Sequence, residues 1–268
     1  MSDALSAPHP SLAARCRWTI DLVRVLTPRE IRSRYRQSVL DIAWALISPI
    51  SVLIVYGIVL TQSFRVSGDG APYLSLAWTG LVLWTFFASA LSSAASSLIS
   101  AHDLLTKVFF PKEALPLSMV GASLADLGIG LLTVAVLLPV QGVHPTRWAP
   151  LALLPIVVLV VWAAAICVLT AVIGAFVRDI PHLVQLFVRV GFFATPVMYD
   201  ENRLPHALHW TATVSPIAVA IDGFRSALLF GRRPDLTLLV VHLVLGAVLL
   251  WLSVLYTRAV ESRVTDVV

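Results

Sequence analysis

The chain has 268 residues, of which 58% are hydrophobic and 13% are charged, and its formal net charge is +4. Soluble domains average roughly 45–50% apolar and about 25% charged residues, so the composition excludes a soluble enzyme, a disordered segment and a disulfide-rich secreted protein. The two cysteines, Cys16 and Cys167, are far apart and predict neither a disulfide framework nor a metal cluster. A lipid bilayer must therefore be the solvent for much of the chain.

Residues 1–40 are predicted to be cytoplasmic and to include an amphipathic helix at the membrane interface. Thr27, Pro28 and Glu30 fit the N-cap, N1 and N3 positions of a capping box, which predicts that the helix starts at Thr27. Its apolar face and basic stripe are expected to lie near anionic headgroups, and they include Arg29, Arg32, Tyr35 and Arg36. The sequence leaves open whether this helix only anchors the chain or also acts as a lever against a cytosolic partner.

Residues 41–257 form the predicted membrane domain, with six apolar runs of about the 20 residues that a spanning helix needs. In chain order these runs are 42–64, 71–101, 114–143, 148–177, 180–199 and 236–257. The alternating ten-residue segments typical of a membrane β-barrel are not present in the sequence. The predicted fold class is therefore all-α integral membrane, with six transmembrane helices.

The positions of Lys and Arg predict the orientation of these spans. With a cytoplasmic N-terminus, twelve of the 19 Lys and Arg residues lie in inside segments and six lie in outside segments. This bias favours cytoplasmic ends for the chain, including the tail 258–268. Between the last two spans, residues 200–235 are too long for a turn and too polar for a span. Within them, 210–220 and 224–230 are apolar and Pro205 and Pro216 break the pattern, so we expect two short re-entrant helices in the outer leaflet.

Four short motifs, in order along residues 30–230, resemble ABC-2 type permeases and more narrowly the membrane subunits of polysaccharide exporters. They are residues 34–40 with Trp44 and Pro49, 103–117, 178–180 with 195–199, and 215–217 with 223–225. Asp41 and His102 depart from the family pattern, which usually has Gly and Asn there. The resemblance implies a homodimer that works with two ATPase subunits in a bacterial inner membrane. Its substrate would be a lipid-linked glycan of the O-antigen, teichoic-acid or cell-wall galactan type.

The sequence offers no site of its own for ATP. A Walker A loop places Lys after Gly and before Ser or Thr, whereas Lys107 follows Thr106 and Lys112 follows Pro111. We therefore expect no cofactor on this chain, and ATP with Mg on a separate ABC ATPase. The resemblance implies that the loop after the second span is the ATPase-coupling loop, formed by His102, Asp103, Leu104, Leu105, Thr106, Lys107 and Phe109.

Aromatic residues on the first, second and fifth spans are candidates for lining the export path. Aromatic rings suit a sliding glycan because the C–H face of a sugar packs flat on a ring, and ordinary packing against helices or lipid is the alternative for each residue. The candidates are Trp44, Tyr56, Trp84, Phe87, Phe192, Phe193 and Tyr199.

Two charged residues fall inside predicted spans, Asp126 in the third and Arg189 in the fifth. An unpaired charge at such depth costs at least about 2.5–3.5 kcal/mol. We therefore expect Asp126 and Arg189 to pair with each other or to face an aqueous path, and Arg189 is also a candidate for meeting the pyrophosphate of a lipid-linked glycan.

Three other functions compete with polysaccharide export. Within the same family, the chain would be the permease of a drug or lipid exporter. A proton-driven transporter would need an acidic relay at mid-membrane, for which only Asp126 and His242 are candidates. A membrane-embedded glycan enzyme would need a catalytic or metal-binding cluster, which the sequence does not supply. We expect no nucleic-acid partner, because the basic residues flank apolar runs.

Overall fold

A computed structural model of the protein describes residues 12–35, 51, 72–101, 110–144, 146–199 and 209–261. The regular secondary structure of these residues is helical, without strands, as the all-α class predicts, and turns and loops join the helices. Four helical segments are long and apolar enough to span a membrane: α3 (Tyr73–Ala95), α6 (Ala114–Val140), η2 with α7 (Ala149–Phe176) and α11 (Leu236–Ala259). They confirm the second, third, fourth and sixth predicted spans as helices. The first predicted span, with Trp44 and Tyr56, lies outside the described residues apart from Ser51.

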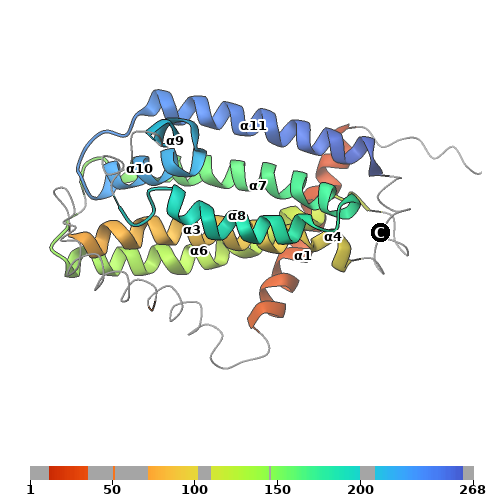
Figure 1. Cartoon of the computed structure of the whole chain (residues 1–268), viewed down its shortest axis with the longest axis horizontal. Helices are drawn as coiled ribbons and strands as arrows, with labels where there is room; N and C mark the ends of the chain where they lie inside the picture. The colour runs from red at the N-terminus through yellow and green to blue at the C-terminus, as the bar shows by residue number, and fades with distance from the viewer. Residues whose placement is uncertain are drawn as a thin grey trace, which may run out of the picture.

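The four long helices run lengthwise through one bundle (Figure 1), with α3 packed against α6 and α7, and α7 packed against α11. In α3, 78% of the most apolar stretch is buried, against 22% in α6 and in α11. Large side chains such as Phe86 and Phe87, together with Leu83, fill the core around α3. The outer faces of α6 and α11 therefore remain apolar and uncovered, as a lipid-facing helix requires.

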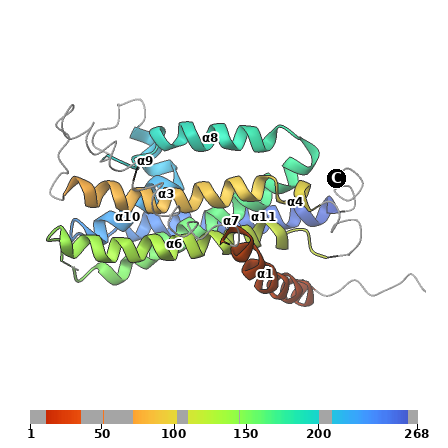
Figure 2. The same ribbon diagram turned by 90° about the horizontal axis from the view of Figure 1, so that it is seen from below.

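Helix α8 (Ile180–Ala194) lies beside α3 on one side of the bundle, opposite α1 (Figure 2). It has 15 residues, which corresponds to roughly 22 Å and is shorter than a bilayer core of about 30 Å. The helix ends before the predicted span does, because Thr195 precedes Pro196 and takes an extended conformation. The chain then turns through Tyr199.

The segment before α11 contains two short helices, α9 (His209–Val214) and α10 (Pro216–Leu228). Ser215 caps α10, since its Oγ accepts a bond from the backbone N–H of Ala218 at 3.4 Å, and Pro216 takes the first helical position that suits proline. Two short helices are thus present, but the break between them falls at Ser215, inside the first apolar stretch of 210–220, and their re-entry into the outer leaflet stays a prediction. The pair lies at one end of the bundle, called here the α10 end (Figure 1).

Helix α1 (Leu12–Tyr35) crosses the bundle near its other end, called here the α4 end after the short helix α4 (Ser97–Ser100) (Figures 1 and 2). The predicted start at Thr27 is wrong, because the helix begins at Leu12 and contains Pro28. Trp18, Leu22 and Leu26 pack against the buried cluster at the α4 end. This burial offsets the hydrogen bond that Pro28 cannot donate. The helix is thereby fastened to the bundle, and Arg36 lies outside the described residues.

Candidate functional site

The predicted coupling loop falls on residues that the structure does not describe, so the roles of His102, Asp103, Leu104, Leu105, Thr106, Lys107 and Phe109 stay predictions. Both flanks are described, namely residues 97–101 and 110–113. They lie at the α4 end, where α1 crosses and α11 finishes. The chemistry of this end therefore determines how the loop is attached to the bundle.

A group of charged and polar side chains joins three elements at the second flank. Glu113 is 1% exposed, and its Oε1 accepts a bond from Arg258 Nε of α11 at 3.0 Å and lies 3.5 Å from Thr19 Oγ1 of α1. Arg15 of α1 also pairs with Glu261, just past α11. These five residues are called the Glu113 cluster. They fix α1, the start of α6 and the end of α11 to one another.

Lys112 is also turned into the protein. Its side chain is 2% exposed, and its Nζ lies 5.2 Å from the centre of the Phe110 ring. Burial lowers the pKa of Lys112, and the nearby Glu261 carboxylate opposes that shift. The Lys112 ammonium therefore belongs to the packed base of the loop.

Asp126 has a partner on α1. Arg34 Nη1 donates to Asp126 Oδ2 at 3.0 Å, and the same guanidinium donates to the hydroxyls of Ser89, Ser93 and Ser123 at 3.0–3.3 Å. The expected pairing with Arg189 is wrong, because α3 separates α6 from α8 (Figure 2). Arg34 thus links the end of α1 to both α3 and α6.

Arg189 lies on the open face of α8 and is not buried. With Thr85, Ala88 and Phe193 it lines an open groove of about 400 Å³ between α3 and α8. Aromatic rings form much of this groove, since the centre of the Trp84 ring lies 6.0 Å from that of Phe192.

The predicted path-lining residues divide between the surface and the core. Phe193 is 60% exposed and meets Phe192 edge-on with ring centres 5.2 Å apart. Phe87, by contrast, is fully buried in the core and does not border the groove between α3 and α8, so its place on the path stays a prediction. The Tyr199 hydroxyl donates to the Phe193 carbonyl at 2.7 Å, which fixes the turn after α8 to that helix.

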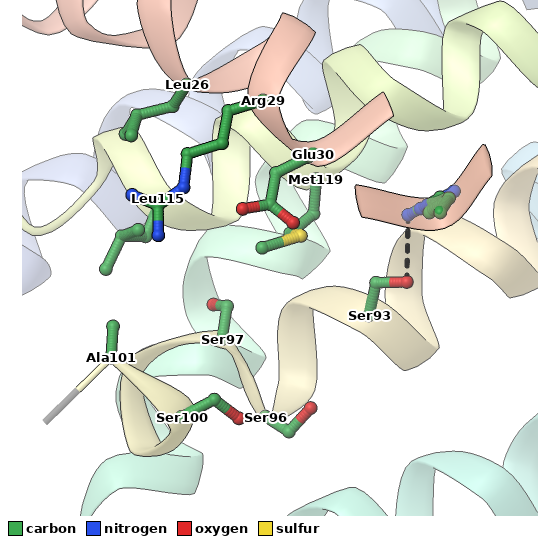
Figure 3. A pocket seen from close by; sticks show the side chains of 11 residues that line it. Leu26, Arg29, Glu30, Ser93, Ser96, Ser97, Ser100, Ala101, Leu115 and Met119 are labelled. Atoms are coloured by element: carbon green, nitrogen blue, oxygen red, sulfur yellow. Dashed lines mark hydrogen bonds between the residues drawn. The ribbon is translucent and has the colours of Figure 1, made fainter. Parts of the chain in front are cut away.

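A polar pocket of about 560 Å³ lies at the α4 end, between α1 on one side and α3, α4 and α6 on the other (Figure 3). Arg29 and Glu30 reach into it from α1, and serine hydroxyls approach from the opposite wall. Its lining residues are Leu26, Arg29, Glu30, Arg34, Ser93, Ser96, Ser97, Ser100, Ala101, Leu115 and Met119. The sequence predicts that Arg29 and Arg32 lie on a stripe facing headgroups. In the structure both are exposed, and Arg29 also borders this pocket.

At the α10 end, one buried arginine holds three segments together. Arg225 of α10 is 3% exposed. Its Nη1 donates to the carbonyls of Pro196 and Tyr199 at 2.8 and 3.1 Å, and its Nη2 donates to those of Leu76 and Val197 at 2.8 and 2.5 Å. Arg225 therefore binds the start of α3 and the turn after α8 to α10.

Sequence reasoning did not assign a role to Arg34, Glu113 or Arg225. In the sequence all three belong to the motifs that resemble the family, and Arg34 and Arg225 also contribute to the charge bias that sets topology. For Arg225 a usable signal existed, since an arginine within the apolar run of α10 needs partners by the same argument as Asp126. Arg34 and its carboxylate partner Asp126 are 92 residues apart along the chain, and Glu113 and Thr19 are 94 apart, which no local pattern reveals.

Comparison with known proteins places the chain in a family. Residues 21–229 match the ABC-2 type transporter family. The O-antigen export system permease protein RfbA of Myxococcus xanthus is 30% identical over 242 residues, which cover 89% of this chain and 90% of that protein. The protein of the same name from Klebsiella pneumoniae is 26% identical over 219 residues, covering 80% and 82%. The chain therefore belongs to the ABC-2 type transporter family of membrane proteins.

Proposed function

We propose that this chain is the membrane-spanning permease subunit of an ATP-driven exporter that moves a lipid-linked polysaccharide across the cytoplasmic membrane of a bacterium. The observation that carries the proposal is the match to a protein named as an O-antigen export permease, which covers 89% of this chain and 90% of that protein. The four helices of spanning length support it. The proposed substrate class includes O-antigens, teichoic acids and cell-wall galactans, each carried on a lipid.

ATP hydrolysis is assigned to a separate ABC ATPase that contacts residues 102–109. The Glu113 cluster supports this assignment, since it ties the base of the loop to α1 and α11, so that a push on the loop moves the bundle. Arg15 and Glu261 are in contact, which puts both described ends of the chain at the α4 end. We assign this end to the cytoplasm, in agreement with the Lys and Arg bias.

The working unit is proposed to be a homodimer whose copies meet along α8 and enclose the export path. Leu186, Phe187 and Val190 are each more than 50% exposed on α8, and Arg189 lies among them. A guanidinium facing hydrocarbon costs several kcal/mol, so this face is better directed at a second copy and at an aqueous path. The rings of Trp84, Phe192 and Phe193 then border the path.

Cysteine cross-linking is expected to show the dimer. In a Cys16→Ser background, Val190→Cys should form a disulfide-linked dimer in membranes under mild oxidation, because two copies of α8 approach each other. Leu132→Cys is the matched control, since Leu132 is 69% exposed and its helix, α6, is separated from α8 by α3 (Figure 2). Equal cross-linking of the two variants, measured on non-reducing gels, would contradict a dimer along α8.

Depletion of the protein in its host is expected to leave lipid-linked glycan in the cytoplasmic leaflet. Because synthesis continues while export stops, the glycan lipid should accumulate several-fold and stay inaccessible to glycan-cleaving enzymes added outside the cytoplasmic membrane. Its sugar composition would identify the glycan type. If no glycan lipid accumulates and the susceptibility to drugs changes instead, the chain is a drug or lipid exporter permease.

A further inference from the structure

The polar pocket at the α4 end lies at the depth of lipid headgroups. Its walls come from the last turns of α3, from α4 and from the first turns of α6. Since α3 and α6 have the length and composition of membrane spans, their ends meet the boundary between hydrocarbon and headgroups. Helix α1 borders the pocket on the side opposite α3 and α4 (Figure 3).

The lining divides into a polar and an apolar part. Ser93, Ser96, Ser97 and Ser100 present hydroxyls on the wall opposite α1, whereas Leu26, Leu115 and Met119 present apolar side chains. Ser93 accepts from Arg34 and Ser97 donates to the Ala94 carbonyl, whereas hydrocarbon alone would leave the hydroxyls of Ser96 and Ser100 without partners among the described residues. A molecule with a polar head and an apolar stem satisfies both parts.

Two opposite charges in the lining have no partner within the part of the chain that the structure describes. Arg29 and Glu30 are neighbours on α1, and both border the pocket. They differ from Arg34, the third charged residue of the lining, which Asp126 and three serine hydroxyls already satisfy. The pocket therefore offers one guanidinium and one carboxylate to a ligand.

These two charges select a zwitterion. A purely anionic headgroup would pair with Arg29 and be repelled by Glu30, and a purely cationic group would meet the reverse. A phosphate beside an ammonium group satisfies both, because the guanidinium can donate two parallel hydrogen bonds to phosphate oxygens. A primary ammonium donates three hydrogen bonds, as the lysine ammonium does, whereas a trimethylammonium group has no N–H to donate to Glu30.

We infer that this pocket binds the headgroup of a phosphoethanolamine lipid, with its phosphate on Arg29, its ammonium on Glu30 and its glycerol region against Leu26 and Met119. The site is distinct from the groove between α3 and α8. It fastens α1 to the bundle through lipid, next to the base of the coupling loop. The inference does not depend on which substrate the protein exports.

Thermal unfolding of the purified full chain in detergent tests the inference. Unfolding can be followed with a thiol-reactive dye, because Cys167 is fully buried and Cys16 is exposed and reacts at once. Phosphatidylethanolamine at about 100 times its Kd is expected to raise the Tm by about 5–10 °C. Phosphatidylcholine and phosphatidylglycerol of the same acyl chains should raise it less.

Substitutions of the two charges separate this site from general lipid effects. Glu30→Gln should remove the advantage of phosphatidylethanolamine over phosphatidylglycerol, and Arg29→Gln should weaken both. Asp21→Asn and Arg24→Gln are the matched controls, since this pair lies on the exposed face of the same helix with side chains 70% and 76% exposed. Both control variants should keep the full preference.

A third variant tests the cavity without altering its charges. Ser100→Phe fills the pocket from α4 and should lose the lipid-dependent rise in Tm, which keeps the test informative if Glu30→Gln does not fold. Equal stabilisation by phosphatidylglycerol and phosphatidylethanolamine in the wild-type chain would overturn the inference. So would a preference for phosphatidylethanolamine that survives Glu30→Gln or Ser100→Phe.

Discussion

Replacing Arg225 by Gln is expected to destabilise the protein by about 3–5 kcal/mol, because the substitution removes charged hydrogen bonds and leaves buried carbonyls without donors. The guanidinium is 3% exposed and serves four backbone carbonyls in two segments. The carbonyls of Pro196 and Val197 lie in a non-helical turn, where no helix ladder can replace the lost donor. Melting of the purified variant, followed by labelling of Cys167, measures the effect.

Lysine is not expected to rescue this position. Its ammonium is a single point of charge, whereas the planar guanidinium spreads its donors over acceptors on two sides. Arg225→Lys should therefore fall between wild type and Arg225→Gln in Tm. Arg233→Gln is the control, since Arg233 is exposed just after α10. A Tm for Arg225→Gln equal to that of this control would refute the role given to Arg225.

The same junction explains a glycine on α3. A Cβ added to Gly80 would lie 2.1 Å from the Val197 carbonyl oxygen and 2.5 Å from Arg225 Nη2, so Gly80→Ala pushes apart the segments that Arg225 holds together. Because both substitutions damage the same contact, the double variant Gly80→Ala with Arg225→Gln should lose less stability than the sum of the losses of the two single variants. Both variants should also reduce export, since the turn they disturb follows directly on α8.

Four of the membrane helices could be predicted from the apolar runs of the sequence. Long charge-free runs have few alternatives in a bilayer, where every backbone polar group must be bonded within its own segment, and α3, α7 and α11 confirm this. The positions at which the helices begin and end are harder to predict from the sequence. The end of α8 at Ala194 follows from the residue pair Thr195 and Pro196, a local signal that an apolar count passes over.

The partners of charged residues could not be predicted, because they depend on how distant segments are placed in space. Asp126 was recognised as needing a partner, and hydropathy suggested Arg189 as the other charge within a span. The partner is Arg34, which precedes the first predicted span and was explained by topology. The start of α1 was mispredicted for a related reason, since Trp18 and Leu22 gain burial against the α4 end that a capping pattern cannot anticipate.

Glu113→Gln is expected to be the second most damaging change, with a loss of about 3–5 kcal/mol, because it leaves Arg258 without its ion-pair partner in a poorly hydrated site. Glu113 is 1% exposed and Arg258 has a side chain that is 14% exposed. Arg258→Gln should cost a similar amount. The double variant should cost less than the sum of the two, since the coupling energy of the pair is then counted once.

The position of the Glu113 cluster predicts a role in transport in addition to its role in stability. Glu113 stands four residues after the predicted coupling loop, and its contacts lead to α1 and α11. If the loop receives the push of the ATPase, a variant that folds but lacks the Glu113 and Arg258 pair should hydrolyse ATP while exporting less glycan per ATP. A variant that only lowers stability would reduce hydrolysis and export in proportion.

The ratio of export to hydrolysis therefore distinguishes a mechanical link from a structural contact. It is best measured at a temperature well below the Tm of each variant, with permease and ATPase reconstituted together in vesicles. Asp21→Asn on the exposed face of α1 serves as control, because an exposed ion pair contributes little to stability. If Glu113→Gln keeps the wild-type ratio, the Glu113 cluster stabilises the fold but does not transmit the motion of the ATPase to the bundle. In that case the push must pass through the other flank, at residues 97–101, where α4 packs against α6 and α7.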